Sequence, residues 1–426
     1  MNEIRDSGPT DGSATFGGPK DSGSAGFAGA KPPGQRPLVV VIFGLLSAIG
    51  PLSIDIYLPA LPAIRTSFGA DQAGALLTLS SFFVGFGLGQ LFWGPLSDRF
   101  GRRWPLLAGL VLYFLASIVC TLGSTIEAMI FWRLVQALGG SAVPVLVQAM
   151  VRDLYDRDHG ARILSLMMLV MGAAPIGAPL LGGQILIWLD WRWIFGVLAI
   201  FGAVSLGAAF LLPETLARSA RRKTRAVAMI VGYIELFGSR RYLGYMFCGA
   251  FFYAALFSFI AGSPFVYIDY FRVPPEFFGF LFGANIVGMM TTSFINARLV
   301  VGRGSDALLR LGCGVAAGAG VVLAVTGSTG IGGIYGIAIP VFAILSMMGF
   351  VGGNATSGAL SIYPGRAGAA AALSGAMQLV MGAVMGAIVG WAADGTPGPM
   401  SLIIFAVAVL SLLFNLTLVG VRREVN

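Results

Sequence analysis

The stretch 75–103 reads ALLTLSSFFVGFGLGQLFWGPLSDRFGRR, an apolar run followed at once by a short charged loop. Residues 75–97 hold no charged side chain and are long enough for a helix that crosses a bilayer, which takes roughly 20 residues. Because a backbone in hydrocarbon must satisfy its own hydrogen bonds, and because apolar and polar residues do not alternate here, a helix is predicted rather than a strand.

The same pattern of apolar run and short polar loop repeats along the rest of the chain. Of the 426 residues, 57% are hydrophobic and 11% are charged, and the mean hydropathy is +0.85. A soluble protein is about one-quarter charged, so this composition excludes a soluble globule, a disordered chain and a disulfide-framed secreted domain. We predict an all-α polytopic membrane protein with twelve spans, near 38–60, 75–97, 104–124, 127–150, 163–187, 193–212, 243–266, 278–299, 309–326, 333–355, 367–390 and 400–420.

A longer polar segment divides these spans into two sets of six. It covers 213–242, is rich in Arg and Lys, and suggests two bundles related as repeats, a common plan among transporters. Residues 1–36 are rich in Gly, Ser, Pro and Asp and contain no apolar run, so we expect disorder and no signal peptide there. The predicted parts are a disordered tail 1–36, an N-terminal bundle 37–212, a cytoplasmic loop 213–242, a C-terminal bundle 243–421 and a tail 422–426.

The Lys and Arg residues indicate which side of the membrane each loop faces. With the N-terminus placed inside, the outer segments hold only Arg65, Arg192 and Arg272, and nearly all other Lys and Arg residues fall in inner segments. This asymmetry is the positive-inside pattern, so both termini are predicted to be cytoplasmic. The formal net charge of +8 is thereby explained by topology, and no nucleic acid is expected as a partner.

The residue types that build metal and redox sites are scarce. Each of the three cysteines, Cys120, Cys248 and Cys313, lies singly in or beside an apolar run, so we expect buried apolar side chains rather than a metal or redox site. The single histidine, His159, lies in a polar loop. No G-x-x-x-x-G-K-[ST] stretch occurs, so ATP is not implied. We expect no metal, no cofactor and no catalytic residues.

The loop Gly94-Pro95-Leu96-Ser97-Asp98-Arg99-Phe100-Gly101-Arg102-Arg103 joins the second and third spans. Glycine permits a tight turn, an acid such as Asp98 can accept from backbone amides at a helix N-terminus, and arginines can pair with acids on neighbouring helices. The loop resembles the signature G-x-L-a-D-r-x-G-r-[kr] of the major facilitator superfamily, which implies a latch between two bundles on the cytoplasmic side. The latch residues, with an expected partner on the fourth span, are Gly94, Asp98, Arg99, Gly101, Arg102, Arg103 and Asp153.

Two more spans carry motifs that resemble this family. Residues 133–140 read RLVQALGG and are similar to its R-x-x-q-G-x-g motif, with Ala137 where the first glycine is usual. An arginine inside the membrane is costly and usually functional, which makes Arg133 a candidate. The fifth span is similar to the G-P-x-x-G-G motif of the drug:proton antiporters, with Ala178 in place of a usual glycine. The antiporter-motif residues are Gly172, Pro175, Gly177, Pro179, Gly182 and Gly183.

The end of the first span, PLSIDIYLPALP at 51–62, resembles the S-x-D-x-Y-L-P-A-x-P segment of the Bcr/CflA subfamily. The segment SPFVYI at 263–268 resembles the same subfamily, and WRWIF at 191–195 and PET at 213–215 resemble the drug-efflux branch of the superfamily. The resemblance implies a major facilitator fold of two six-helix bundles, alternating access, and a place in the bacterial inner membrane. It implies efflux of drug-like or small amphipathic compounds in exchange for protons, by a chain expected to be a monomer in contact with small-molecule substrate, protons and lipid.

Asp55 and Arg133 are the only charged residues well inside the predicted spans. At about 1.5 Å per residue, both fall in the outer half of a core about 30 Å thick. If they face one cavity, each offsets the cost of burying the other, and protonation of Asp55 removes half of the pairing. That is the physics of a proton-coupled switch, whereas a static structural pair is the alternative. Asp269 and Asp394 are lesser candidates, expected as solvated charges at loop ends.

The substrate pocket is expected between the two bundles. Polar and aromatic side chains within the spans, together with adaptable methionines, are the types available to line it, although each could equally join one helix to another. The candidates are Tyr57, Gln136, Gln148, Tyr253, Asn285, Met289, Asn354 and Gln378.

Other functions stay open at this stage. The first alternative is a major facilitator exporter or importer of one specific metabolite. An integral-membrane enzyme is the second, but it would need several convergent polar groups, and this chain offers one histidine and few acids in its spans. A structural or sensor protein that acts through residues 1–36 is the third.

Overall fold

The computed structural model describes residues 37–221 and 235–419. All regular elements in these ranges are helical, and 12 segments are long and apolar enough to cross a membrane, which confirms the predicted number of spans. The predicted tails, 1–36 and 422–426, lie outside the described residues. The long helices are α1 Pro37–Ser47, α2 Ile49–Asp55, α3 Leu61–Phe68, α4 Gln72–Phe100, α5 Arg103–Thr121, α6 Ile126–Gly140, α7 Ala142–Leu154, α8 Arg157–Trp188, α9 Arg192–Phe210, α11 Arg240–Pro264, α12 Pro275–Arg303, α13 Ser305–Thr329, α14 Gly333–Ser346, α15 Met348–Ile362, α16 Ala367–Trp391 and α17 Gly398–Phe414.

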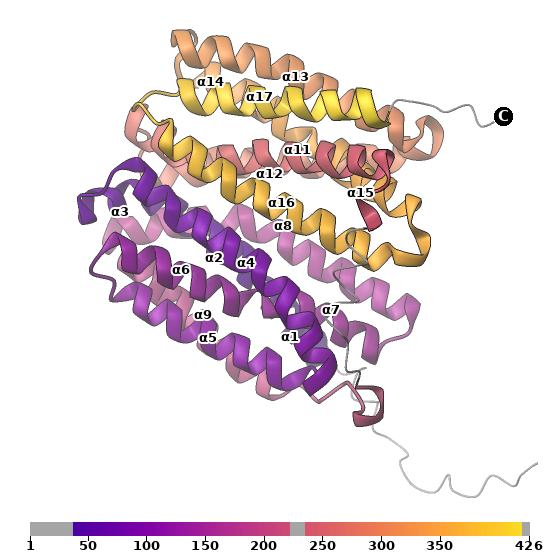
Figure 1. Ribbon diagram of the computed structural model, residues 1–426. Helices are drawn as coiled ribbons and strands as arrows, with labels where there is room; N and C mark the ends of the chain where they lie inside the picture. The colour runs from indigo at the N-terminus through magenta and orange to yellow at the C-terminus, as the bar shows by residue number, and fades with distance from the viewer. Residues whose placement is uncertain (1–36, 222–234, 420–426) are drawn as a thin grey trace, which may run out of the picture.

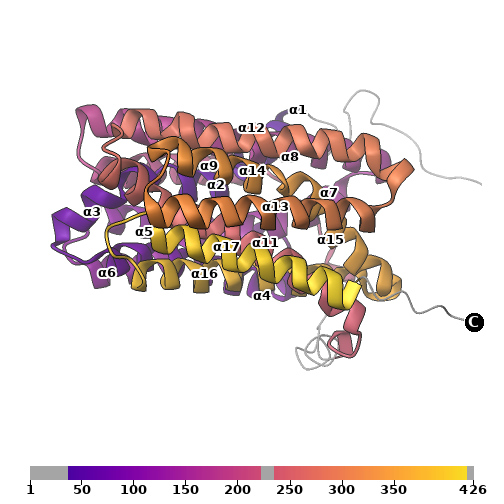
Figure 2. The same cartoon turned by 90° about the horizontal axis from the view of Figure 1, so that it is seen from above.

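These helices form two six-span bundles that lie side by side (Figure 1), and Figure 2 looks onto the C-terminal bundle with the N-terminal bundle behind it. In the N-terminal bundle α4 packs on α6, and α5 packs on both α6 and α9. In the C-terminal bundle α11 packs on α16 and α17, and α13 packs on α17. Two helix pairs, α4 with α16 and α8 with α12, make most of the contact between the bundles.

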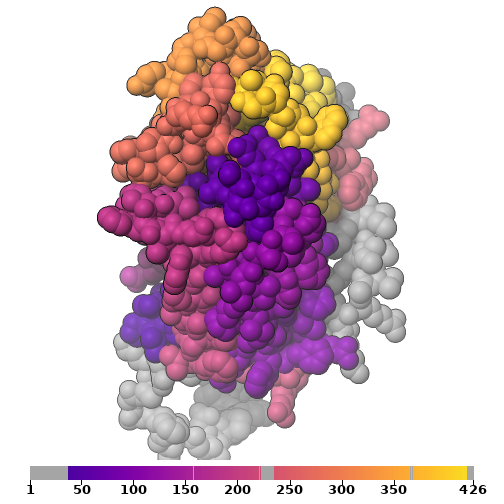
Figure 3. All heavy atoms as spheres, turned by 90° about the vertical axis from the view of Figure 1, so that its left-hand side faces the viewer, coloured from indigo at the N-terminus to yellow at the C-terminus, as the bar shows by residue number. Residues whose placement is uncertain are grey.

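The two ends of the molecule differ in charge, and we name them accordingly. The basic end carries the turns at 101–102, 155–156 and 304, and the described arginines gather there. The opposite end carries the turns at 69–71 and 271–274, and its arginines are Arg65, Arg192 and Arg272. Figure 3 looks onto the opposite end and shows the indigo end of the first span lying directly against the helices of the C-terminal bundle.

The first span is broken into pieces and is longer than predicted. It runs on to Phe68, with α1 ending at Ser47, α2 ending at Asp55 and a 3₁₀ turn at Leu58–Ala60. Proline has no backbone N–H, so the carbonyl four residues before it loses its helical partner. Pro59 stands four residues after Asp55, which places this acid at the end of a helical piece in the middle of a span.

At the opposite end the bundles touch through glycines. A Cβ built on Gly183 of α8 would lie 2.5 Å from the carbonyl oxygen of Pro275 in α12. One built on Gly279 of α12 would lie 2.7 Å from the backbone nitrogen of Leu180. Real side chains do not tolerate such distances, so only glycine lets these two helices approach this closely.

Towards the basic end the same helix α8 borders open space. A Cβ built on Gly172 or Gly177 would meet no heavy atom within 4 Å outside its own helix. Pro175, between these two glycines, is half-buried, and Pro179, between Gly177 and the packed end, is buried. Figure 1 shows the ribbons of α8 and α12 diverging towards the basic end. Along α8, the glycines near the opposite end are therefore in close contact with neighbouring backbone, whereas Gly172 and Gly177 have free space beside them.

Candidate functional site

The Arg133 side chain lies inside the N-terminal bundle among aromatic rings. It is fully buried, and its Cζ lies 4.2 Å from the ring centre of Tyr57, 4.3 Å from that of Phe82 and 5.6 Å from that of Phe195. The faces of aromatic rings attract a cation most strongly where water is absent. The intramembrane arginine predicted from the sequence thus occupies an aromatic box, contributed by the first, second and sixth spans.

Two hydrogen bonds fix the direction of this guanidinium. It donates to Oε1 of Gln136 at 2.6 Å and to the backbone carbonyl of Ser53 at 3.2 Å. Gln136 donates in turn to the Ser117 hydroxyl at 2.7 Å, and the hydroxyls of Ser53 and Tyr113 share a hydrogen bond of 2.7 Å. All of these side chains are buried. Removal of the cation would leave two buried acceptors, on Gln136 and Ser53, without this donor, so Arg133 anchors the first span to its bundle.

Asp55 is buried as well, with 4% of its surface exposed, but it has no comparable partners. Within the described parts of the chain its carboxylate has no hydrogen-bond donor and no cation within 4.0 Å. The hypothesis of an ion pair between Asp55 and Arg133 is therefore wrong for this conformation, because the guanidinium binds the Ser53 carbonyl and the rings instead. The two residues do share one depth in the molecule, since Ser53 precedes Asp55 by only two positions.

The break after Asp55 is in contact with the antiporter motif. A Cβ built on Gly182 would collide with the carbonyl oxygen of Ile56. The next residue, Gly183, abuts Pro275 of the other bundle, as described above. One end of the motif is thus wedged between the segment that carries Asp55 and the start of α12.

Among the ion pairs of the described residues, one crosses between the bundles. Arg65, at the end of the first span, lies 3.0 Å from Asp269, in the π-helical turn Phe265–Tyr270 that ends the seventh span. Their side chains are 33% and 28% exposed, so Asp269 is a partnered charge and not the solvated one expected from the sequence. A cavity of about 40 Å³, lined by both residues together with Gln72 and Thr396, lies beside the pair.

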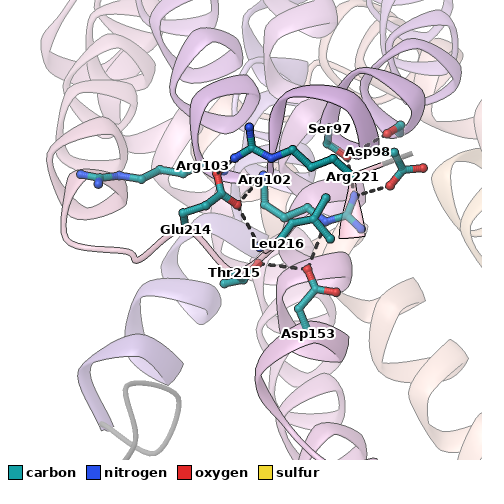
Figure 4. A network of polar contacts seen from close by, with 10 residues as sticks. Ser97, Asp98, Arg102, Arg103, Asp153, Glu214, Thr215, Leu216 and Arg221 are labelled. Atoms are coloured by element: carbon teal, nitrogen blue, oxygen red, sulfur yellow. Dashed lines mark hydrogen bonds and ion pairs between the residues drawn. The ribbon is translucent and has the colours of Figure 1, made fainter. Parts of the chain in front are cut away.

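Arg102 is the centre of a polar network at the basic end (Figure 4). Its guanidinium donates to Asp98 at 2.6 Å, to Ser97 at 2.7 Å and to Asp153 at 3.1 Å. The predicted ion pair between a loop arginine and Asp153 is therefore present. Thr215 donates to the same carboxylate of Asp153 at 3.0 Å, which ties the chain after the sixth span to the fourth span.

The start of α5 is capped by Glu214. Its carboxylate accepts from the backbone N–H groups of Arg102 at 2.8 Å and Arg103 at 3.3 Å. We expected Asp98 to take this role, and that was wrong because the Asp98 carboxylate pairs with the Arg102 side chain. Gly101 has a φ of +97°, and a Cβ there would collide with the Glu214 carboxylate. Only glycine allows this cap to form.

The remaining loop residues also contact their own bundle. Arg103 donates to the carbonyl of Phe210 at 2.7 Å, Arg99 lies over the adjacent aromatic ring, and Gly94 packs beside α7. Over residues 37–221 and 235–419, no group of the C-terminal bundle joins this network in its hydrogen bonds or ion pairs. The latch between the bundles stays a prediction.

The candidate pocket residues have different surroundings. Tyr57 and Gln136 are fully buried and surround Arg133. Asn354 donates to Asn296 at 2.8 Å and so joins α15 to α12 within one bundle. The pocket itself stays a prediction. Of the others, Asn285 is buried with an Oδ1 that has no described partner, Tyr253, Met289 and Gln378 are half-buried, and Gln148 is exposed.

The residue types that commonly bind metals are dispersed. No group of three or more His, Cys, Asp or Glu side chains that could hold a metal occurs in the described ranges. His159 lies in the first turn of α8 and not in a loop, and its backbone N–H donates to Asp156 at 2.9 Å. This hydrogen bond, with one from the imidazole, holds the pKa of Asp156 below its usual value. The three cysteines are buried, as predicted.

Sequence reasoning missed most of the groups that hold Arg133. Tyr113 and Ser117 stand four positions apart in the third span, a spacing that places them on one helix face. That was the one available signal. Nothing in the sequence connects this face to Ser53, which lies 60 positions before Tyr113. Glu214 belongs to the segment PET at 213–215, and the resemblance of that segment to known transporters does not assign it a role.

The comparisons with known proteins agree with this architecture. Residues 43–390 match the family model described as Major Facilitator Superfamily. The chain is 32% identical to a bicyclomycin resistance protein homolog of Haemophilus influenzae, over 88% of this chain and 94% of that protein. It is 31% identical to a chloramphenicol resistance protein of Pseudomonas aeruginosa, over 74% and 70% of the two chains. Its fold is similar to that of a D-xylose–proton symporter, with a TM-score of 0.71 at 17% identity, over 90% and 97% of the chains.

Proposed function

This chain belongs to the major facilitator superfamily, within it to the Bcr/CflA subfamily, and from that membership we propose that it exports small, amphipathic, drug-like compounds in exchange for protons. The two named relatives are resistance proteins, which supports drug-like substrates. The chain is a multi-pass membrane transporter, and we place it in the bacterial inner membrane as a monomer. Its proposed partners are substrate, protons and lipid, with no nucleic acid and no metal.

One observation carries the assignment of proton coupling to Asp55. This carboxylate is 4% exposed, and among the described residues no donor or cation accompanies it. An ionised carboxylate in such a site is costly, whereas the protonated acid is not. In this conformation the closed packing therefore favours a neutral Asp55, and entry of a substrate or water would favour release of its proton.

The positive-inside pattern supports the direction of the cycle. If the basic end faces the cytoplasm, this conformation is closed on the periplasmic side and open on the cytoplasmic side. Rocking of the bundles would separate Gly183 from Pro275 and release Gly182 from the chain at Ile56. The segment that carries Asp55 would then meet the periplasm, where a proton is loaded for the return step.

Arg133 acts in this scheme through position and not through charge pairing. Its hydrogen bond to the Ser53 carbonyl and its box of rings hold the first span two positions before Asp55. We assign it as a positioning residue, in place of the charge pairing with Asp55 predicted from the sequence. The substrate contacts are proposed among the less buried candidates, Tyr253, Asn285, Met289 and Gln378.

The test is substrate-induced proton release from purified protein in weakly buffered detergent, with a panel of antibiotics and dyes. We expect wild type to release protons with at least one compound, and Asp55→Asn to bind it without release. Asp394→Asn is the matched control, because Asp394 is an exposed acid outside the spans, and it should behave as wild type. Unchanged proton release from Asp55→Asn would overturn the assignment and favour Asp269 or uncoupled transport.

A further inference from the structure

Two cysteines that the sequence places far apart are in contact inside the C-terminal bundle. Sγ of Cys248 in α11 lies 3.5 Å from Sγ of Cys313 in α13. Both side chains are fully buried, and 65 positions of chain separate them. The expectation of two isolated apolar side chains therefore describes their burial but not their pairing.

Polar groups from a third helix complete this cluster. Oγ of Ser411 in α17 lies 3.6 Å from Cys248 Sγ and 3.5 Å from Cys313 Sγ, and it donates to the Cys248 carbonyl at 2.8 Å. One turn further along, Asn415 is 1% exposed, and its side-chain amide has no hydrogen-bond partner among the described residues. Buried polar groups of this kind are costly, so a bundle core does not collect them by chance.

The separation of the two sulfur atoms is close to what a covalent bond requires. A disulfide brings them to about 2.05 Å, an approach of about 1.5 Å from the observed distance. A movement of this size is small compared with a side chain, and no other cysteine competes. Cys120 is also buried, but it lies in the other bundle with no thiol neighbour, and it is the internal control.

We propose that Cys248 and Cys313 form a reversible dithiol–disulfide pair, which links α11 to α13 when a two-electron thiol oxidant reaches the bundle. The first thiol loses its proton and its sulfur bonds to the oxidant. The second sulfur attacks the first, the S–S bond forms, and the reduced oxidant leaves. Two electrons and two protons pass from the thiols to the oxidant; with the azo compound diamide, the product is the corresponding hydrazine.

The link would lie wholly within one bundle. It would close the long chain segment between the two cysteines, and disulfides stabilise proteins in part by restricting such segments in the unfolded state. Alternating access moves one bundle against the other, so a bond inside the C-terminal bundle leaves that motion free. The disulfide is therefore expected to raise stability and to leave transport largely intact.

The test uses the full-length protein in liposomes, treated with diamide, alkylated and digested for mass spectrometry. We expect a linked peptide pair containing Cys248 and Cys313, with Cys120 recovered in its alkylated form. The apparent Tm should rise by roughly 5 °C, and dithiothreitol should reverse both changes. No linked pair in correctly folded protein, or a pair that includes Cys120, would overturn the proposal.

Serine variants test which cysteines form the link, and a second reagent tests whether the two thiols are neighbours. Cys248→Ser and Cys313→Ser should each abolish the linked pair and the rise in Tm, and Cys120→Ser should keep both. Phenylarsine oxide, a trivalent arsenical, should bridge the two thiols with loss of water in the wild type and fail to bridge either single variant. Absence of that adduct in folded wild-type protein would show that the two sulfur atoms are not neighbours.

Discussion

The two ends of the interface between the bundles are held by different interactions. At the opposite end, backbone meets backbone through Gly183 and Gly279, with one ion pair beside them. At the basic end, ion pairs are more numerous, but each one found in the described residues joins groups of a single bundle, as in Arg102 with Asp153 or Arg241 with Asp306. The ion pairs at the basic end thus stabilise each bundle by itself, and the uncharged glycine contacts at the opposite end join the two bundles.

The comparison teaches where the conformational free energy of this state resides. The close approach of backbone to backbone at these glycines gains dispersion contacts along the whole contact between α8 and α12. These contacts are lost together when the two helices separate. Ion pairs within a bundle are kept in every conformation that keeps the bundle. Four changes, in order of decreasing expected effect, test this division.

Gly183→Ala should have the largest effect. The added Cβ meets the Pro275 carbonyl at 2.5 Å, and overpacking of this kind costs about 1–3 kcal/mol, so the closed end should open in most molecules. The measurement is maleimide labelling of a cysteine introduced at Gln72, beside the cavity of the opposite end, together with transport. Gly172→Ala, in the same helix but next to open space, is the matched control and should leave the labelling unchanged. Equal labelling of the two variants would refute the role of the glycine contacts between α8 and α12.

Arg102→Gln should have the next largest effect, and on a different property. It removes charged hydrogen bonds to Asp98 and Asp153, which are partly exposed, so we expect a loss of about 1–2 kcal/mol in stability, seen as a lower Tm. Labelling at the opposite end should not change, because the network lies within one bundle. A rise in labelling like that of Gly183→Ala would instead show that the loop couples the bundles.

Arg65→Ala removes the one ion pair that crosses between the bundles in the described residues. Both partners are about one-third exposed, so the pair is worth roughly 0.5–1 kcal/mol and its loss should increase labelling at the opposite end only a few-fold. Exchange of the two charges, in Arg65→Asp combined with Asp269→Arg, should restore the wild-type level. If the exchanged variant labels like the single one, the pair contributes through packing and not through charge.

A lower pH should have the smallest effect, which is confined to the first turn of α8. The pKa of Asp156 is lowered by the backbone N–H of His159, so this cap stabilises the helix at pH values above the ordinary pKa near 3.8 and is lost as the pH falls through the lowered value. The protection of the amides in the first turn of α8, measured as hydrogen exchange relative to the intrinsic rate at the same pH, should therefore fall below about pH 4. Asp156→Asn keeps the capping oxygen without titrating, and its exchange should not follow that pH dependence.

The sequence predicted the parts of the molecule that depend on local composition. Each apolar run is long enough to determine a span without reference to any other, and the loop arginines point to Asp153 because the motif joins adjacent spans. The surroundings of Arg133 depend instead on chain folding, since its donor–acceptor contact with Ser53 joins positions 80 apart. Glu214 reaches Arg102 over 112 positions for the same reason. The break in the first span at Asp55 could have been predicted, because Pro59 follows this residue by four positions in the sequence.

The confinement of ion pairs to single bundles has an electrical consequence. A membrane voltage does work on net charge that moves across it, about 2.3 kcal/mol per elementary charge per 100 mV, and does none on a pair that moves together. Arg241 with Asp306 would travel as a nearly neutral pair when the bundles rock, and Asp98 and Asp153 would travel with the Arg102 cation that offsets one of their two charges. The voltage would then do little work on such pairs in a single rocking step, and Arg133, a buried cation with no acidic partner among the described residues, is a charge on which it would act.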